Sequence, residues 1–358
     1  MPTAAAAFPT IRYTSPAHSS LALATVPPIP LPTVLHTPGR RPSARGDAPP
    51  APAPWMPGAG ECAVAVGNFD GVHRGHAAIV ARLCGLAKTL GVPAVALTFD
   101  PHPASVVRPE ASPAALTTPE RRAALLMDLG VDAVLVQPAT RDLMALSAER
   151  FYADILRDRL RVRGLVEGED FRFGAGRGGD IGMLRGFCDR DGISLETVAA
   201  VMVGGQPVSS SRLRGLIVRG DVRGAAALLT APYRLTGTVV EGARRGGPLG
   251  FPTANLANVA TLLPAAGVYA ARAVVPGLGI HPAAVHVGVN VTFGETRPTV
   301  EAHLIGFTGT LYGTSLDVDF LERLRDTQKF DSIDSLRAQL TADVAGALQI
   351  VRSAFPTT

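Results

Sequence analysis

Lysine is nearly absent from this chain of 358 residues: two lysines, Lys88 and Lys329, stand against 32 arginines. A Walker A phosphate loop needs a Gly-Lys-Ser/Thr step, and Lys88 follows an alanine. The sequence therefore excludes the P-loop class of nucleotide-binding proteins. Protein-kinase chemistry is excluded as well, because it needs a lysine on an early strand within a longer motif set that is absent here.

Cysteines and long apolar runs are also scarce. The three cysteines, Cys62, Cys84 and Cys188, show no Cys-x-x-Cys spacing, so we expect neither a disulfide framework nor a zinc site, and a cytoplasmic location. No apolar run approaches the ~18 residues of a membrane span. Residues 21–26 run directly into two prolines and make a poor signal-peptide core, so we expect no membrane partner.

Net positive charge is also scarce outside the first 57 residues. The formal net charge is +4, and the first 57 residues alone carry +3, from Arg12, Arg40, Arg41 and Arg45 against Asp47. The rest of the chain is nearly neutral and has no basic face, although the pI is about 9.2. We therefore do not expect a nucleic-acid partner.

Proline is unevenly spread, since 14 of the 30 prolines fall within the first 57 residues. That segment lacks hydrophobic periodicity, so we predict a disordered Pro/Ala-rich tail over residues 1–57. Three interpretations stay open: an extension before a true start at Met56, a targeting peptide, or an interaction tail. The remaining ~300 residues are enough for two domains.

From residue 61 onward, short apolar runs alternate with helical stretches. Strands are predicted at residues 62–66 and 93–99, on either side of a helix over residues 77–90. Further helix starts at Thr118 and Ser147 lead to more apolar runs. This alternation is typical of a doubly wound α/β domain with a buried parallel sheet.

Past Pro232 the pattern changes to short β-rich runs separated by glycine and proline turns, which is typical of a small antiparallel barrel or sandwich. The runs cover residues 234–240, 268–275, 283–289, 299–305 and 315–320. A helix is predicted from residue 332 to about 348. We place the domain boundary near residue 230.

The segment from Gly67 to His76 follows the first predicted strand and opens a helix, where free backbone N–H groups and the helix dipole favour anions. His73 and His76 are three residues apart, so both imidazoles project to one side of the first turn and can hydrogen-bond triphosphate oxygens. Gly75 between them allows a ligand to approach the backbone closely. The segment predicts a nucleotide site, and a solvated surface pair is the alternative.

This segment resembles the His-x-Gly-His signature of the nucleotidyltransferase superfamily. Its Gly-Asn-Phe-Asp-Gly-Val-His form is similar to that of the bacterial bifunctional riboflavin kinase/FMN adenylyltransferase (FAD synthetase) family. Residues 98–103, 168–174 and 209–214 match further segments of that family in the same order. The resemblance implies a Rossmann-like, parallel-sheet nucleotidyltransferase domain over residues 58–230, which adenylylates FMN with ATP.

The resemblance also implies roles for individual residues. His73, His76 and Arg212 would be catalytic. The flavin would lie against Asp170, Phe171 and Phe173. The remaining positions would bind ATP or its phosphates: Gly67, Asn68, Phe69, Asp70, Gly71, Gly75, Ser209, Ser210, Ser211 and Arg214.

Some of these positions have structural alternatives. Phe171 and Phe173 alternate, so one can be core while the other lines a pocket. The serine run from Ser209 can be a helix cap alone, although Arg212 and Arg214 beside it favour a second phosphate cradle. Two positions depart from the family pattern. Ser211 stands where threonine is usual and keeps the hydroxyl. Glu167 adds a carboxylate where an apolar residue is usual.

Residues 237–255 form a Gly-rich run that ends in Pro-Thr-Ala-Asn. Such a loop can wrap phosphates with its N–H groups, and the oxygens of Thr253 and Asn255 are hard donors suited to Mg²⁺. The run resembles the riboflavin kinase module, and the resemblance extends over residues 232–350. It implies a small antiparallel β-barrel kinase domain with a C-terminal helix over residues 231–358.

In residues 299–304 the apolar side chains share one face and leave Glu301 on the other. The resemblance makes Glu301 the general base that takes the proton from the ribityl 5′-hydroxyl; a solvated strand glutamate is the alternative. It further implies Mg²⁺ at Thr253 and Asn255, flavin at Arg325 and Phe330, and phosphates at Gly237, Gly242, Gly246 and Gly250. Two positions depart from the family pattern: Gly247 stands where a basic residue is frequent, and Val291 stands where proline is frequent. Arg244 or Arg245 can supply the positive charge that Gly247 lacks.

The leading hypothesis is a two-headed enzyme that makes FMN from riboflavin and ATP, and then FAD and pyrophosphate from FMN and ATP, with Mg²⁺. Its partners would be these small molecules, and a transient homo-oligomer is left open. A nucleotidyltransferase for another substrate is the first alternative, against which the C-terminal module argues. A flavin-binding regulator with dead sites is the second, against which the intact His73, His76 and Glu301 argue.

Overall fold

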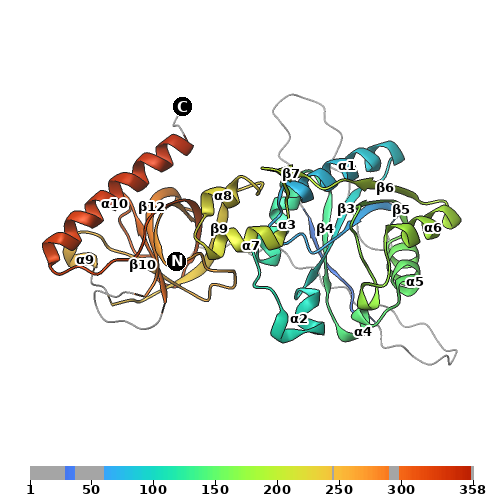
Figure 1. Cartoon of the computed structure of the whole chain (residues 1–358), viewed down its shortest axis with the longest axis horizontal. Helices are drawn as coiled ribbons and strands as arrows, with labels where there is room; N and C mark the ends of the chain where they lie inside the picture. The colour runs from blue at the N-terminus through green and yellow to red at the C-terminus, as the bar shows by residue number, and fades with distance from the viewer. Residues whose placement is uncertain (1–28, 37–59, 244–245, 290–297, 356–358) are drawn as a thin grey trace. The chain divides into compact units, whose positions relative to one another are not determined.

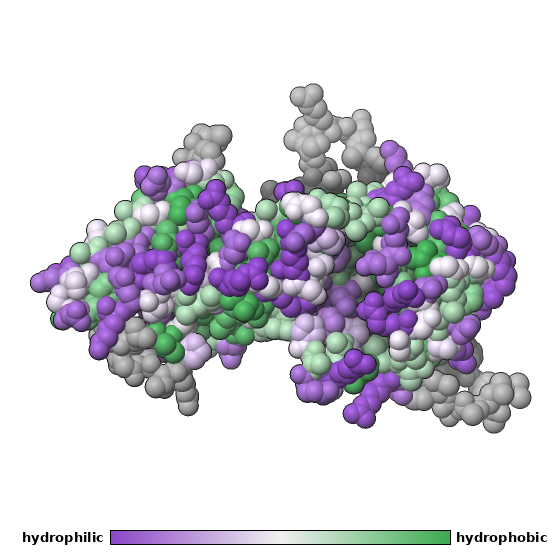
Figure 2. Space-filling view, in the orientation of Figure 1, coloured by the Kyte–Doolittle hydropathy of each residue, from purple (hydrophilic) through white to green (hydrophobic). Residues whose placement is uncertain are grey.

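The computed structural model describes residues 29–36, 60–243, 246–289 and 298–355. Within these ranges the chain forms two compact units: residues 29–113 with 119–208, and residues 114–118 with 209–355. Hydrophilic residues are spread over the visible face of each unit (Figure 2). In the described part of the chain, every helix is too short or too polar to cross a membrane.

The first unit is built on a six-stranded sheet in the order β1-β4-β3-β2-β5-β6 (Figure 1). Strands β2 to β6 are parallel, as predicted, and β1 is antiparallel to β4. The strand order reverses between β2 and β5, so their carboxyl ends form the switch point where open α/β sheets bind ligands. The strands are β1 (Thr33–His36), β2 (Cys62–Val66), β3 (Ala94–Asp100), β4 (Ala133–Pro138), β5 (Val162–Gly168) and β6 (Ser194–Val198).

Helices follow the strands and pack on the sheet. Two predicted starts are confirmed: one helix begins at Pro119, and the Ser147 hydroxyl caps another by accepting from the Arg150 N–H at 3.2 Å. The first long helix begins at Arg74 rather than at residue 77. The elements are α1 (Arg74–Leu90), α2 (Pro103–Val107), η1 (Pro109–Ala111), α3 (Pro119–Asp128), α4 (Arg141–Met144), α5 (Ala148–Arg150), the π-helical η2 (Phe151–Arg159), η3 (Ala175–Arg177), α6 (Ile181–Asp191), β7 (Met202–Val203) and β8 (Gln206–Pro207).

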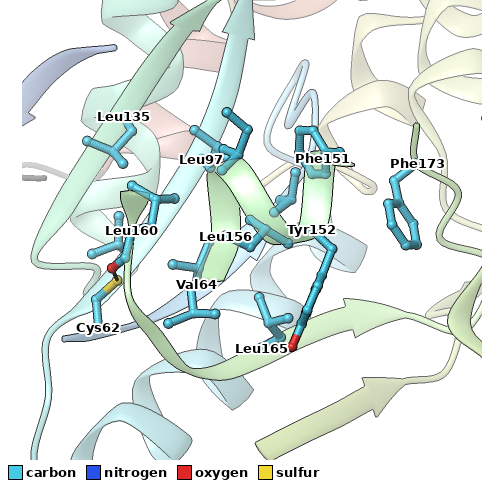
Figure 3. Close-up of a cluster of buried hydrophobic side chains, with 14 of the residues drawn as sticks. Cys62, Val64, Leu97, Leu135, Phe151, Tyr152, Leu156, Leu160, Leu165 and Phe173 are labelled. Atoms are coloured by element: carbon cyan, nitrogen blue, oxygen red, sulfur yellow. Dashed lines mark hydrogen bonds between the residues drawn. The ribbon is translucent and has the colours of Figure 1, made fainter. Parts of the chain in front are cut away.

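Aromatic and aliphatic side chains from η2 fill the core of this unit against the sheet (Figure 3). Phe151 and Tyr152 share this cluster with Leu165 and other fully buried strand residues, and Tyr152 lies beside Leu165. The Cys62 thiol donates to the Leu160 carbonyl at 3.2 Å, and burial raises the pKa of Cys62 to about 12. This cysteine therefore stays a neutral packing group.

The expectation of a tail without structure over residues 1–57 is wrong for its described part, residues 29–36. Thr33–His36 forms the edge strand β1, with Val34 paired to Leu135 and buried. Gln137 Nε2 also donates to the Pro30 carbonyl at 2.9 Å. The proline-free run Thr-Val-Leu-His is too short to show periodicity, yet it can pair with the open edge of β4. The other residues of the predicted tail, Met56 included, lie outside the described residues.

The second unit contains a closed antiparallel barrel in the order β10-β13-β12-β11-β14-β9, which confirms the barrel implied by the resemblance. The C-terminal helix packs on β11, β12 and β14 (Figure 1), and it extends six residues beyond the predicted end. The elements are β9 (Tyr233–Val240), α9 (Gly246–Leu249), β10 (Ala254–Ala257), β11 (Gly267–Val275), β12 (Gly279–Gly288), β13 (Thr299–Leu304), β14 (Ser315–Arg325) and α10 (Ile333–Ala354).

The division between the compact units differs from the predicted boundary near 230. Helices α7 (Ser210–Val218) and α8 (Val222–Ala226) belong to the barrel unit. The Ile217 carbonyl accepts from the Ala265 N–H at 3.2 Å, and Arg223 lies 3.2 Å from Glu322 of β14. Both helices therefore contact the barrel, a tertiary relationship that local sequence patterns do not carry.

Candidate active sites

His73 and His76 lie at the start of α1, directly beyond the carboxyl end of β2. The backbone N–H of each residue donates to Nδ1 of the other at 3.3 Å, which forms a reciprocal capping box. The two rings stack with their centroids 3.6 Å apart. Because each Nδ1 is an acceptor, a neutral ring carries its proton on Nε2 and can donate it outward.

Burial keeps this histidine pair uncharged. Desolvation lowers the pKa of His73 to about 4, against the backbone hydrogen bond and the nearby Asp70, which raise it. The pKa of His76 is lowered far below its ordinary value, first by burial and then by the charges of His73 and Arg122. At neutral pH the pair therefore offers two neutral Nε2–H donors at a helix N-terminus, an arrangement suited to phosphate oxygens.

The loop before the pair has an unusual backbone. Phe69, Gly71 and Val72 have φ values of 46°, 86° and 41°, and the Val72 N–H donates to the Phe69 carbonyl at 3.0 Å. Phe69 is buried and packs edge-on against His76 at 5.2 Å. A Cβ on Gly67 would stand 3.3 Å from the Phe69 ring, so this glycine gives the ring its space.

Asn68 connects this loop to the segment after β3. Its side-chain amide lies 3.0 Å from His102 Nε2, while His102 Nδ1 accepts from the Ala104 N–H at 3.1 Å. The Asn68 atom that faces His102 Nε2 is Nδ2, so this contact ties the Asn68 side chain to the segment after β3.

The predicted flavin residues of this unit separate in the structure. Phe173 is buried in the core cluster, 6.2 Å from Phe151, and Phe171 is half-buried and stacks on it at 5.5 Å. Asp170 is exposed. The core alternative therefore holds for Phe173, while Phe171 and Asp170 stay candidates for the flavin.

The serine run lies in the barrel unit, at the start of α7. Ser209 is an N-cap whose hydroxyl accepts from the Arg212 N–H at 3.2 Å, and Arg214 Nε donates to the Ala114 carbonyl at 2.8 Å. The structure therefore confirms that Ser209 caps the helix α7. The phosphate cradle formed by Ser209, Ser210 and Ser211 with Arg212 and Arg214 stays a prediction.

Glu167 is almost completely buried, with 2% of its surface exposed, and Oε1 accepts from the Val66 N–H at 2.8 Å. Burial raises the pKa of Glu167 well above the ordinary glutamate value, against the hydrogen bond from Val66, which lowers it. The departure from the family pattern thus places a carboxyl group whose charged form is disfavoured next to the end of β2.

The barrel unit has a cavity of about 530 Å³ lined by the β9–β10 connection, β13 and α10. Predicted site residues on its wall are Gly242, Gly246, Thr253, Asn255, Glu301, Arg325 and Phe330. Gly237 is not on this wall: it lies within β9, where a Cβ would stand 2.9 Å from the Ala257 carbonyl. Gly250 is also off the wall and ends the turn after α9 with a φ of 91°.

Glu301 lies on the outer face of β13, opposite the buried Val300 and Ala302. The Thr299 hydroxyl donates to Oε1 at 3.2 Å, and the Thr253 hydroxyl approaches Oε2 at 3.5 Å. The carboxylate therefore faces the cavity in a fixed orientation. A freely solvated strand glutamate, the alternative interpretation, would not be held from both sides.

The residues present fit a magnesium ion. Asn255 of β10 is the direct cross-strand partner of Glu301, and a Cβ on Gly242 would overlap the Asn255 carboxamide. The described residues hold no cluster of three or more His, Cys, Asp or Glu side chains arranged for a metal. Mg²⁺ takes one or two protein oxygens together with substrate phosphates and water, and the side-chain oxygens of Thr253 and Asn255 on the cavity wall are donors of this kind.

Arg325 joins the barrel to the C-terminal helix. Its guanidinium donates to the Asp343 carboxylate of α10 at 2.7–3.1 Å and lies 5.8 Å from the Phe330 ring centroid. The structure thus gives Arg325 a positioning role at the cavity wall. Gly247 stands in open space, whereas Arg244, Arg245 and Val291 lie outside the described residues.

Sequence reasoning assigned no role to two residues near the sites, His303 and Arg122. His303 Nδ1–H donates to the Pro252 carbonyl at 2.8 Å, next to Thr253, and His303 lies on the same face of β13 as Glu301. Arg122 is buried in α3 beside the loop of residues 67–73. The i, i+2 spacing from Glu301 could have indicated His303, whereas Arg122 is hidden within an ordinary helical pattern.

Comparisons with known proteins place the chain in a family. A family model described as FAD synthetase matches residues 57–212, and one described as riboflavin kinase matches residues 229–351. A bifunctional riboflavin kinase/FMN adenylyltransferase of Pseudomonas fluorescens is 39% identical over 287 residues, which are 80% of this chain and 92% of that protein. The chain belongs to this family.

Other relatives agree. The bifunctional riboflavin kinase/FMN adenylyltransferase of Escherichia coli (strain K12) is 34% identical over 79% of this chain and 90% of its own length. A crystal structure described as a macrolide-efflux protein from Streptococcus pneumoniae is 30% identical, with a TM-score of 0.72, and covers 80% of this chain and 93% of that one. The family membership and the fold expected from the sequence are therefore confirmed.

Proposed function

We propose that this member of the family phosphorylates riboflavin with ATP to give FMN, and then transfers AMP from a second ATP to FMN, giving FAD and pyrophosphate. The observation that carries the proposal is that each unit holds its own set of reactive groups. The sheet unit has the His73 and His76 pair, and the barrel unit has Glu301 on a cavity. We assign adenylyl transfer to residues 58–230 and phosphorylation to residues 231–358.

In the kinase reaction, Glu301 accepts the proton of the ribityl 5′-hydroxyl while that oxygen attacks the γ-phosphorus of ATP. The bond between the γ-phosphorus and the β,γ-bridging oxygen breaks, and ADP leaves. The two threonine hydroxyls hold the carboxylate on the cavity wall, where the riboflavin hydroxyl would reach it. Thr253 and Asn255 would hold Mg²⁺, which supplies charge neutralisation on the phosphates. The α10 side of the cavity, with Arg325 and Phe330, would contact the flavin.

In the adenylyl transfer, a phosphate oxygen of FMN attacks the α-phosphorus of ATP and pyrophosphate leaves. Charge on the phosphate oxygens rises in the transition state, and the Nε2–H groups of His73 and His76 are held in place to receive it. The N-terminus of α1 adds its free N–H groups. The roles of Arg212 and Arg214 in this step stay predictions from the family resemblance.

A time course with purified protein, riboflavin, ATP and Mg²⁺ tests the proposal. Chromatography should show FMN rising first and FAD following at its expense. Glu301→Gln and His73→Ala variants serve as controls: Glu301→Gln should form neither product from riboflavin, because FAD is made from FMN, whereas His73→Ala should accumulate FMN without FAD. If the wild-type chain forms neither product, or forms another nucleotide conjugate, the proposed function is wrong.

A further inference from the structure

Arg122 is a buried cation that neither the motifs nor the proposed reaction uses. Only 5% of its surface is exposed, in the middle of α3. Burying a guanidinium costs free energy unless hydrogen bonds and opposite charges replace the lost water. The hydrogen-bond and ion-pair partners of Arg122 therefore indicate the role of its charge.

The partners of Arg122 belong to the strand end and the loop that form the nucleotide site. Nη1 donates to the Thr98 hydroxyl and to the Phe99 carbonyl, both at 3.0 Å. Nη2 lies 3.7 Å from Oδ1 of Asp70, whose side chain is 2% exposed. The Thr98 hydroxyl in turn donates to the Asn68 carbonyl at 3.0 Å. One guanidinium thus holds the end of β3 and, directly or through one hydroxyl, both Asn68 and Asp70.

This loop needs such support because its backbone is strained. Positive φ values at Phe69 and Val72 cost free energy, and a β-branched residue such as valine rarely adopts them. A strained loop persists only where surrounding groups fix it. The loop leads directly into His73, so its geometry sets where both imidazoles begin α1.

The charge of Arg122 also acts on the histidines. It is one of the groups that lower the pKa of His76, after burial and His73. The groups that act on or face Arg122 are Asp70 from the loop, Asp100 from β3 and His76 from α1. Protonation of His76 would place a proton on Nδ1 and break the capping box, so a nearby cation protects that box against acid.

We propose that Arg122 is a positioning residue for adenylyl transfer: it fixes the loop of residues 67–73 and the end of β3, so that His73 and His76 meet the nucleotide phosphates in one geometry. It acts through Thr98 and Asp70 and need not touch the substrate. This inference rests on the proposed function, because it concerns how the site around His73 works.

The test uses the full chain with Arg122→Met, which keeps an unbranched side chain without the charge, and Arg122→Lys, which keeps the charge without the two-nitrogen fork. Arg185→Met, on the exposed face of α6, removes the same charge elsewhere. FMN formation by the barrel unit of the same molecules serves as an internal control. FAD formation from supplied FMN is measured as kcat and KM from pH 4 to 8.

We expect Arg122→Met to lose roughly 100-fold in kcat for FAD formation, because a displacement of about 1 Å can cost this much. The acid limb of its pH profile should move to higher pH, because the pKa of His76 rises when the cation is removed. Arg122→Lys should restore the position of the acid limb and only part of kcat. Arg185→Met and the kinase rate of every variant should stay within twofold of wild type.

Two results would overturn the inference. One is an unchanged kcat and acid limb in Arg122→Met. The other is an equal loss in both Arg122 variants with an unmoved acid limb and a lowered melting temperature of the sheet unit, which would show that Arg122 serves stability alone. If Arg122→Met fails to fold, Arg122→Lys decides: a lowered kcat at the wild-type melting temperature supports the inference, whereas an unchanged kcat, or a loss that accompanies a lowered melting temperature, overturns it. Absence of FAD from the wild-type chain would instead contradict the proposed function itself.

Discussion

Asn255 on β10 and Glu301 on β13 are direct partners in the barrel ladder, so a candidate metal ligand and the candidate base occupy one row of the sheet. Paired residues of an antiparallel ladder point to the same face, with their Cβ atoms about 5 Å apart. The hydrogen bonds of two strands therefore set the spacing between the group that would hold Mg²⁺ and the group that would take the proton. No flexible loop intervenes between them.

Replacement of this base gives the first prediction. Glu301→Gln keeps the shape and the contacts with Thr253 and Thr299 but removes the basicity. FMN formation should fall ~10²–10⁴-fold, because a general base typically contributes this much. FAD formation from supplied FMN should keep its wild-type rate. An unchanged kinase rate in initial-rate assays would show that Glu301 is not the general base.

The second prediction concerns the glycine beside Asn255. In Gly242→Ala the new Cβ would overlap the Asn255 carboxamide and push it from its place, so we expect kinase kcat to fall by at least tenfold and the Mg²⁺ concentration for half-maximal rate to rise. Gly247→Ala is the matched control, because its Cβ would meet open space. Equal rates for the two variants would show that the position of Asn255 does not matter for phosphorylation.

The histidine pair gives the third prediction. His73→Ala and His76→Ala should each lower FAD formation by ~10²–10³, the usual cost of one preorganised donor. Each also removes half of the capping box, which should destabilise the sheet unit by about 1 kcal/mol. FMN formation should not change. A parallel fall in the kinase rate would contradict the separation of the two sites.

Much of the fold could be predicted because its determinants are local. The buried run at residues 62–66, the alternating strand at residues 299–305 and the Ser147 cap follow from apolar patterning and side-chain capping. The loop from Gly67 to His76 was recognised from its glycines and histidines. These features need only neighbours within a few residues.

The rest depends on contacts between distant segments. Strand β1 exists because β4 has an open edge, and α7 joins the barrel through Ile217 and Ala265. Arg122 matters only because α3 places it beneath a loop fifty residues earlier. Gly237 looked like part of a phosphate loop, but the packing of β10 against β9 explains it.

The fourth prediction follows from the placement of α7 and α8. A fragment of residues 232–358 should phosphorylate riboflavin and form no FAD, because it contains Glu301 but neither histidine. A fragment of residues 209–358 should do the same and melt roughly 5–10 °C higher, because burial of residues such as Val222 contributes about 1.5 kcal/mol or more each. Calorimetry of both fragments measures the difference. Equal melting temperatures would show that the two helices do not stabilise the barrel.

The last prediction concerns pH and Glu167. Burial raises the pKa of this carboxyl in the folded state, whereas in the unfolded chain it titrates near 4.5. Above pH 4.5 the unfolded state therefore loses a proton that the folded state keeps, and stability falls as pH rises toward the raised pKa. Glu167→Gln keeps an oxygen for the Val66 N–H and cannot ionise, so it should lack this loss. In calorimetric scans from pH 5 upward, the sheet-unit melting temperature of wild type should fall relative to that of the variant, by roughly 3–5 °C for each pH unit below the raised pKa, since one unit corresponds to about 1.4 kcal/mol. The barrel transition in the same scans is the control. If the sheet-unit melting temperatures of wild type and Glu167→Gln changed equally with pH, Glu167 would ionise freely in the folded protein.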